Sequence, residues 1–215
     1  MKPSKRKSDP GRLVLYKRPD LTPYLIHLTK NTSSTDKFSA YENLVHILET
    51  GKIWGSGSSG GFIKGPNKAT CFMDVPFPAL KFILDKDNAD PGDPRYEAYG
   101  VVISKKFAYK HGCRPVLYLS DEETSRLKIT SDEIWRVVRF EQTKTRKISW
   151  IHEREWRCKG SFHLPKEPLA VLVQTTEDAA KLAKRIAKGK PLKSPPQSII
   201  PIEIMCQGLP FLMEK

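Results

Sequence analysis

The sequence predicts an α+β fold, in which short strands and helices alternate irregularly along the chain. Apolar runs of strand length, such as residues 101–103 and 170–173, are separated by segments with helical periodicity and clear capping signals. Proline and glycine occupy the turns between them. Because the elements do not follow the strict strand–helix–strand order of a doubly wound parallel sheet, we expect a mixed arrangement.

The first half of the chain contains one helix with complete boundary signals. Ser39 and Glu42 form a capping box, apolar residues supply a stripe, and Gly51 ends the helix. The Gly-Ser run at residues 55–61 cannot pack a core and is predicted to be a mobile loop. The other elements predicted in this half are strands at 13–16, 24–28, 69–72 and 101–103 and helices at 79–84 and 104–111.

The second half is predicted to end in a strand, a helix and a strand. A second capping box, Thr130 with Glu133, indicates a helix over residues 132–140. Gly189 ends a basic helix that begins near Glu177. The strands predicted in this half are 115–119, 153–159, 170–173 and 199–204.

Positive charge is large and unevenly distributed. The formal net charge is +13, and residues 1–18 carry seven basic side chains against one acid. This composition predicts a disordered basic arm over residues 1–12, ahead of a single domain at 13–215. A second cluster, residues 181–193, contains no acid, and Lys184, Arg185 and Lys188 lie on neighbouring helical turns. Such fields attract polyanions, so nucleic acid is the expected partner, although a solvated helix face would look the same.

Composition also argues against several other classes of protein. No apolar run reaches the roughly 18 residues of a membrane span, and the basic N-terminus lacks the apolar segment of a secretory signal. We therefore expect a cytoplasmic protein without a membrane partner. The four cysteines lie far apart with no C-x-x-C pair, which favours reduced thiols over a zinc site or a disulfide framework.

Residues 150–157, Trp-Ile-His-Glu-Arg-Glu-Trp-Arg, have the densest concentration of reactive side chains. In a strand, Glu153, Glu155 and Arg157 would share one face. A carboxylate held on a strand beside cations suits a general base or the stabilisation of a developing cation. Glu155, with Arg157 beside it, is therefore the candidate catalytic residue. The alternative is an edge strand with solvated charge pairs.

Two stretches resemble known families. His27-Leu28-Thr29, the capped helix after it and then Gly51-Lys52-Ile53-Trp54 resemble the opening of DarT-type ADP-ribosyltransferases. Residues 71–76, 99–103, 112–118 and 153–157 resemble the AbiGi-type abortive-infection proteins of phage defence. Together these motifs span about residues 24–160.

The resemblance implies an ADP-ribosyltransferase-like fold, with split antiparallel or mixed sheets, flanking helices and NAD bound in the split as a co-substrate. It places His27 and Thr29 at the nicotinamide end and Glu155 at the ribose. Trp54 and Tyr118 are candidate aromatic residues of the NAD pocket, with a core position as the alternative for Trp54. No metal is required, and the catalytic arginine of DarT-type enzymes has no clear counterpart here.

The leading hypothesis is an NAD-dependent ADP-ribosyltransferase toxin of phage defence. It would act on nucleic acid or a nucleic-acid-associated target, and an antitoxin or defence partner would restrain it. One alternative is a non-catalytic nucleic-acid-binding defence module. Another is a metal-dependent nuclease using Asp74, Glu97, Glu153 and Glu155. Under the leading hypothesis, Glu155→Gln should reduce activity by on the order of a hundredfold and leave thermal stability little changed.

Overall fold

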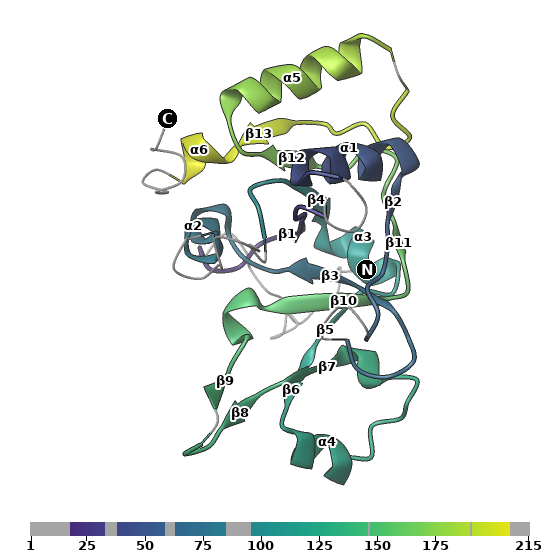
Figure 1. Cartoon of the computed structure of the whole chain (residues 1–215), viewed down its shortest axis with the longest axis vertical. Helices are drawn as coiled ribbons and strands as arrows, with labels where there is room; N and C mark the ends of the chain where they lie inside the picture. Colours follow the sequence, from purple (N-terminus) through teal and green to yellow (C-terminus); the bar gives the residue numbers. More distant parts are fainter. Residues whose placement is uncertain are drawn as a thin grey trace, which may run out of the picture.

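Seven strands form one mixed sheet in the computed structural model, which describes residues 18–32, 38–58, 63–84, 96–145, 147–189 and 191–206 (Figure 1). Strands β12 and β13 pair in parallel and the other neighbours pair antiparallel. In spatial order the strands are β13 (Ile199–Pro201), β12 (Ala170–Val173), β4 (Gly100–Ser104), β1 (Tyr24–Leu28), β3 (Ala69–Met73), β10 (Glu155–Lys159) and β5 (Arg114–Pro115).

The sheet is split between its central strand, β1, and the neighbouring strand β3. Strand β1 pairs with β4 at five positions and β10 pairs with β3 at five, but β1 pairs with β3 only at Ile26 and Met73. A side chain strengthens this weak junction, since Nδ1 of His27 lies 2.9 Å from the carbonyl oxygen of Cys71. The sheet therefore consists of two halves that diverge from a single contact, as the α+β prediction with split sheets anticipated.

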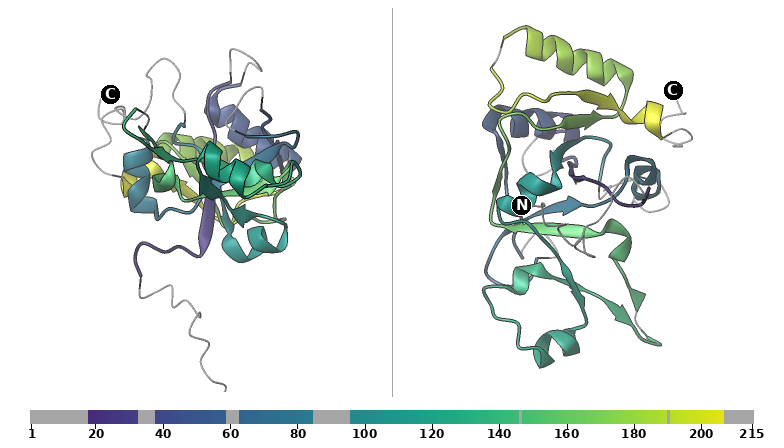
Figure 2. Two further views of the ribbon diagram at one scale, coloured as in Figure 1. Left: turned by 90° about the horizontal axis from the view of Figure 1, so that it is seen from below. Right: turned by 180° about the vertical axis from the view of Figure 1, so that it is seen from behind.

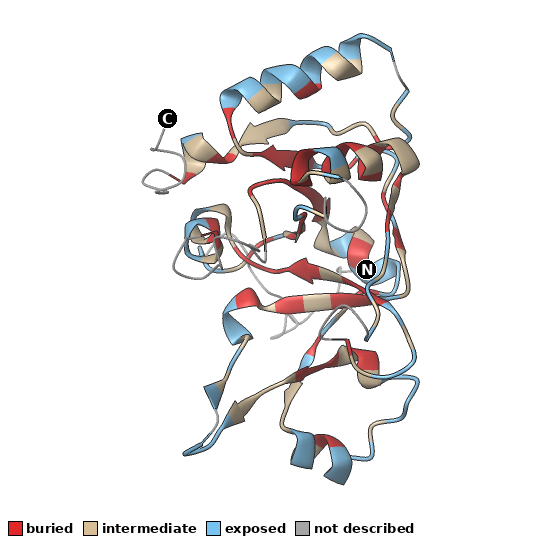
Figure 3. Ribbon diagram, viewed as in Figure 1, coloured by how far each residue is buried: buried red, intermediate tan, exposed pale blue. Residues whose placement is uncertain are grey.

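Apolar residues on alternate positions of the strands form a core on each face of the sheet. One core joins Leu25, Val101 and Val171 to helices α1 (Ala40–Thr50), α3 (Lys105–Lys110) and α5 (Thr176–Ala187). The other joins Ile26 and Val102 to α2 (Leu80–Ile83) and α6 (Ile202–Met205). Figure 3 shows the buried positions concentrated along the central strands and the inner side of the helices.

Helix α1 forms where its capping signals predicted. Oγ of Ser39 accepts a hydrogen bond from the Glu42 N–H at 3.2 Å, and the Glu42 carboxylate accepts the Ser39 N–H at 2.8 Å. Gly51 ends the helix with a φ of 64°, a conformation that glycine adopts without strain. Strand β2 (Lys52–Ile53) follows at once and pairs with β11 (Phe162–His163).

Residues 114–157 leave the main sheet as β5 and return to it as β10. Between them lie a parallel pair, β6 (Leu117–Leu119) with β7 (Val137–Arg139), a short hairpin, β8 (Glu141–Gln142) with β9 (Lys147–Ile148), and helix α4 (Asp121–Arg126). We call residues 114–157 the lower lobe. Figures 1 and 2 place it at the end of the long axis opposite α5.

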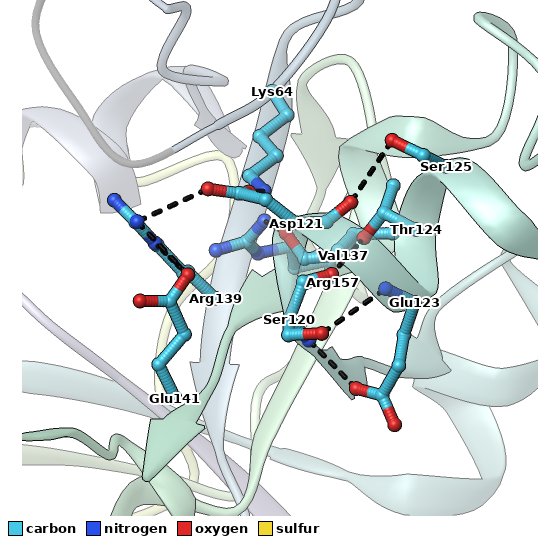
Figure 4. Close-up of polar contacts among 10 residues, drawn as sticks. All are labelled: Lys64, Ser120, Asp121, Glu123, Thr124, Ser125, Val137, Arg139, Glu141 and Arg157. Carbon is cyan, nitrogen blue, oxygen red and sulfur yellow. Dashed lines mark hydrogen bonds and ion pairs between the residues drawn. The ribbon is translucent and has the colours of Figure 1, made fainter. Parts of the chain in front are cut away.

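Helix α4 has its own capping box, and ion pairs join it to its surroundings. Ser120 and Glu123 form its capping box. Asp121 pairs with Lys64 at 2.6 Å and with Arg139 at 3.1 Å (Figure 4). The loop before β3 is thereby tied to the lower lobe. None of the helices in the described part of the chain is long and apolar enough to cross a membrane.

The predicted helix over residues 132–140 is wrong. The chain makes a short 3₁₀ turn at Ile134–Arg136 and then strand β7, because Val137 and Val138 are β-branched and bury their side chains in the lobe. The effective capping box is the earlier one, at Ser120 and Glu123. Helix α4 was not predicted, and tertiary packing of the valines overrode the local capping signal at Thr130 and Glu133.

Three element boundaries also differ from prediction. The strand predicted at 115–119 is broken at Val116, and the last strand ends at Pro201, where α6 begins. Glu153 belongs to a 3₁₀ turn rather than to β10, because Arg154 takes a left-handed conformation with φ of 47°. The predicted basic arm, the strand at 13–16 and residues 59–61 of the Gly-Ser loop lie outside the described residues, whereas Ser56 of that loop forms a bridge with Ala69.

Candidate functional site

A cavity of about 760 Å³ opens where β1 and β3 diverge. This volume falls within the roughly 300–1,000 Å³ that is usual for small-molecule sites. Its walls come from residues 26–30, residues 69–73 and one side of α1, and its acidic side chains are Glu153 and Glu155. The split in the sheet therefore creates a candidate site for a small molecule.

Glu155 is held rigidly at the wall of this cavity. Only 7% of the residue is exposed, and its two carboxylate oxygens accept from the Arg157 guanidinium, Oε1 from Nε at 2.8 Å and Oε2 from Nη2 at 3.2 Å. The two residues are two positions apart on β10, so their side chains leave the same face of the strand. Each carboxylate oxygen can still accept one further hydrogen bond from a ligand.

Arg157 is itself anchored by the lower lobe. Its Nη1 donates to the carbonyl oxygens of Trp135 at 2.7 Å and Val137 at 3.3 Å, and Figure 4 shows its side chain beside Val137. Burial opposes its charge most strongly, but Glu155 and Cys71 together outweigh burial and keep the pKa of the guanidinium above its ordinary value. Arg157 therefore orients Glu155 and balances its charge.

Tyr118 lies behind Glu155 and is not part of the cavity wall. Its Oη accepts the Glu155 N–H at 3.1 Å and donates to the carbonyl oxygen of Trp150 at 3.3 Å. Burial raises the pKa of the Tyr118 phenol, so the group stays protonated at neutral pH. The position predicted for contact with NAD is instead one that supports the backbone of Glu155.

His27 lines the cavity from β1. Its Nδ1 donates to the Cys71 carbonyl, which fixes the tautomer and leaves Nε2 as an acceptor. Burial lowers the pKa of the ring, with the Cys71 carbonyl opposing the shift. The imidazole is therefore neutral at pH 7 and presents an unprotonated Nε2.

Thr29 lines the same cavity, and its hydrogen bonds stabilise the cavity wall. Its hydroxyl donates to the Ala40 carbonyl at 2.9 Å, and its N–H donates to the Tyr99 carbonyl at 2.8 Å. The first bond joins the end of β1 to the first turn of α1, and the second joins it to the residue before β4. The hydroxyl oxygen still has lone pairs that can accept a hydrogen bond from a ligand.

Trp54 lies at the rim of the cavity in a stack of three rings and is not a core residue. It is 47% exposed, and its ring lies parallel to His46, with centroids 5.0 Å apart. His46 in turn stacks on Phe38 at 5.6 Å, and the Lys52 ammonium lies 5.5 Å from the Trp54 ring centroid. All three rings line the cavity, which gives its mouth a flat aromatic edge.

Sequence reasoning missed several residues of the site. Cys71 faces Arg157 across the β3–β10 pair, and burial together with the Glu155 charge raises the pKa of its thiol. Tyr96 places its Oη 3.4 Å from both carboxylate oxygens of Glu153, a residue only 2% exposed. No local signal could have found them, because their proximity depends on strand pairing and on a loop 57 residues away in sequence.

The acids proposed as nuclease ligands do not come together. Asp74 faces away from the cavity, accepts the Thr22 hydroxyl at 2.9 Å and pairs with Lys105 at 2.8 Å. Among the described residues, no group of three or more His, Cys, Asp or Glu side chains is placed to hold a metal ion. The nuclease alternative therefore has no ligand set in the described part of the chain.

Of the basic residues predicted to contact nucleic acid, Lys184 and Arg185 lie on α5 and Lys188 is its C-cap, and none of them belongs to the cavity wall. Lys184 and Lys188 are exposed. Arg185 donates through Nη2 to the Glu49 carboxylate at 2.5 Å, which ties α5 to the end of α1. Only the two lysines are thus directed entirely to solvent.

Three solved structures of Thermus sp. 2.9 DarT are similar to this chain. The complex with NAD+ matches with a TM-score of 0.44 and 12% identity, and the complex with carba-NAD+ with 0.45 and 14%; each match covers 84% of this chain and 96% of the other. The complex with ADP-ribosylated ssDNA matches with 0.40 and 14%, over 84% of this chain and 95% of the other. No protein-family model matches the chain, and no curated protein matches it significantly. Because the identities and TM-scores are low, we infer function from the chain's own side chains.

Proposed function

We propose that this protein is an NAD-dependent ADP-ribosyltransferase that modifies nucleic acid. The observation that carries the proposal is the buried Glu155 carboxylate, held by Arg157 at the wall of a cavity of about 760 Å³. The ion pair fixes the orientation of this carboxylate. The low-dielectric surroundings strengthen its electrostatic interaction with charge that develops on a ligand. The resemblance of the His27-Leu28-Thr29 motif to the DarT-type opening supports the same reaction.

In this reaction, the bond between the nicotinamide nitrogen and the ribose C1′ breaks and nicotinamide leaves with the bonding electrons. The acceptor then bonds to C1′ and loses a proton. Glu155 would accept a ribose hydroxyl through the free lone pairs of its oxygens and oppose the positive charge that develops on the ribose. Arg157 holds the carboxylate in place and balances its charge, and Tyr118 holds its backbone.

The other side chains of the cavity would position the co-substrate. The neutral His27 ring offers Nε2 to a donor such as the nicotinamide amide, and Thr29 keeps β1 and α1 at a set distance. The exposed face of Trp54 and its stacked neighbours would take a planar ring at the cavity mouth. Nothing in this arrangement requires a metal ion.

Nucleic acid as the acceptor follows from the net charge of +13 and the lysines of α5. We propose that the enzyme works in the cytoplasm, where NAD and nucleic acid occur together. A role as a phage-defence toxin, restrained by an antitoxin or defence partner, rests on the resemblance to DarT-type and AbiGi-type proteins. A non-catalytic nucleic-acid-binding module is the second candidate, supported by the same charge distribution.

The test is incubation with NAD and, separately, single-stranded DNA, duplex DNA and RNA, with and without a chelator. Nicotinamide release and the mass of ADP-ribose on the acceptor would be measured. Glu155→Gln should lose transfer, whereas Glu141→Gln, which also removes a carboxylate paired with an arginine but lies outside the cavity, should retain it.

Each outcome decides between the candidates. Transfer to a nucleic acid that requires Glu155 but not a metal ion supports the proposal. Binding of nucleic acid with no turnover of NAD on any acceptor would identify the non-catalytic module. Cleavage that the chelator abolishes would identify a nuclease and refute the assignment of Glu155.

A further inference from the structure

Two cysteines far apart in sequence face one another across β5 and β10. The antiparallel register pairs Trp156 with Pro115 and Arg157 with Arg114. One more step in the same register places Cys113 opposite Cys158. Residues directly opposite in an antiparallel pair have Cα atoms roughly 4.5–5.5 Å apart, which is within the range of roughly 4.4–6.8 Å that a disulfide requires. The two cysteines could therefore be linked without moving the backbone.

Both cysteines belong to the same buried core cluster. Hydrogen bonding with the Cys113 thiol lowers the pKa of Cys158, and the charge of the nearby Arg114 lowers it further. The same contact, together with burial, raises the pKa of Cys113. Cys158 is therefore the thiol that ionises first, and Cys113 is the thiol opposite it in the register.

The surroundings of Cys158 leave a route for a small oxidant. Its Sγ lies 3.3 Å from the His111 carbonyl oxygen, beside the exposed turn of His111 and Gly112 that ends α3. Gly112 has no side chain over the sulfur, and a Cβ there would lie 3.9 Å from Sγ. Cys113 is fully buried, whereas Cys158 retains 7% exposure.

We propose that Cys113 and Cys158 are an oxidation site at which hydroperoxides form a reversible disulfide. The Cys158 thiolate attacks one peroxide oxygen, which breaks the O–O bond and leaves a sulfenic acid on Cys158 and hydroxide in solution. The Cys113 sulfur then attacks the Cys158 sulfur, displaces the hydroxyl and gives up its own proton, so that this oxygen leaves as water. Overall, two thiols and one hydrogen peroxide become one disulfide and two waters.

The linkage would close the base of the lower lobe. The lower lobe begins directly after Cys113 and ends directly before Cys158, so the two cysteines flank it in sequence. The lobe supplies the Trp135 and Val137 carbonyls that hold Arg157, and the Tyr118 hydroxyl that holds Glu155. Oxidation thus restricts opening at the point where the lobe meets the candidate site.

The experiment treats the full chain with hydrogen peroxide, blocks remaining thiols with a maleimide and measures intact mass and linked peptides. We expect the loss of two hydrogens, a peptide linking residues 113 and 158, and full reversal by dithiothreitol. Cys71→Ala and Cys206→Ala are the matched controls and should still form the link. Cys113→Ala and Cys158→Ala, checked for folding by circular dichroism, should not form it.

Thermal unfolding provides a second readout. Closing the loop from 113 to 158 should raise the Tm of the oxidised protein by roughly 10 °C, and reduction should reverse the rise. Oxidation of Cys158 to sulfinic acid with Cys113 still free would overturn the proposal, as would a folded protein in which peroxide links neither thiol. A disulfide without any rise in Tm would contradict the closure of the lobe. Neither measurement involves NAD, so these results are independent of the proposed activity.

Discussion

Replacing Glu155 with glutamine tests the stability of the site as well as its chemistry. In the native protein both carboxylate oxygens accept from Arg157, and the two residues are 7% and 2% exposed. Glutamine keeps the size of the side chain and one acceptor oxygen, but its amide nitrogen is a donor. That donor would face an N–H of Arg157, and the guanidinium charge would remain buried without its counter-ion.

The magnitude follows from this geometry. Removing one partner of a buried ion pair typically costs about 3–5 kcal/mol, and the retained acceptor places Glu155→Gln near about 3 kcal/mol. For a chain of 215 residues this corresponds to a fall in Tm of roughly 6–12 °C. The structure therefore changes the expectation from sequence, which was a loss of activity with little change in stability.

The assay separates the two effects with a double-mutant cycle. Thermal or urea unfolding is measured for Glu155→Leu, Arg157→Met and the combination of the two. The combined variant should be more stable than the sum of the single losses predicts, because no unpaired charge remains. Recovery should be partial, since Trp135 and Val137 keep carbonyl groups that Arg157 had satisfied.

Transferase activity should show no such recovery. We expect all variants of Glu155 to lose on the order of a hundredfold or more, including the stabilised double variant. If the double variant regained activity with stability, Glu155 would be a structural residue and the proposed chemistry would be wrong. An unchanged Tm in Glu155→Gln would show that the pair is not a buried ionic contact.

Three further predictions use other parts of the structure. Because burial lowers the pKa of His27 below its ordinary 6.5, the fold should lose stability as pH falls below about 6.5, and His27→Gln should reduce that loss in pH-dependent unfolding. The double substitution Lys184→Glu and Lys188→Glu should weaken nucleic-acid binding. It should also reduce the magnitude of the slope of log affinity against log salt by about the number of phosphates that the two lysines neutralise. An unchanged slope would show that this end of α5 is only a solvated surface. Tyr118→Phe leaves the Glu155 N–H without its acceptor, so unfolding free energy should fall by about 1–3 kcal/mol and kcat should fall more than KM rises; a change confined to KM would place Tyr118 against the co-substrate instead.

Local sequence determined the elements whose stabilising contacts are close in the chain. Helix α1 could be predicted because Ser39 and Glu42 cap its N-terminus and Gly51 caps its C-terminus. Strands β1 and β12 could be predicted because each is a short apolar run of the kind that forms a buried strand. Glu155 could be singled out for the same reason, since its acidic and basic neighbours are adjacent in sequence. The helix predicted at 132–140 failed because its capping signal was local but the burial of its valines was not.

Only the tertiary structure decided what surrounds these residues. The pairing of β10 with β3 and β5 brings Cys71 to Arg157 and Cys113 to Cys158, and the divergence of β1 from β3 opens the cavity. The same packing buries the Glu155 and Arg157 pair, which turns a conservative substitution into a destabilising one. Strand register and burial depend on contacts between residues far apart in the chain. Local composition therefore does not predict which residues become neighbours in the fold.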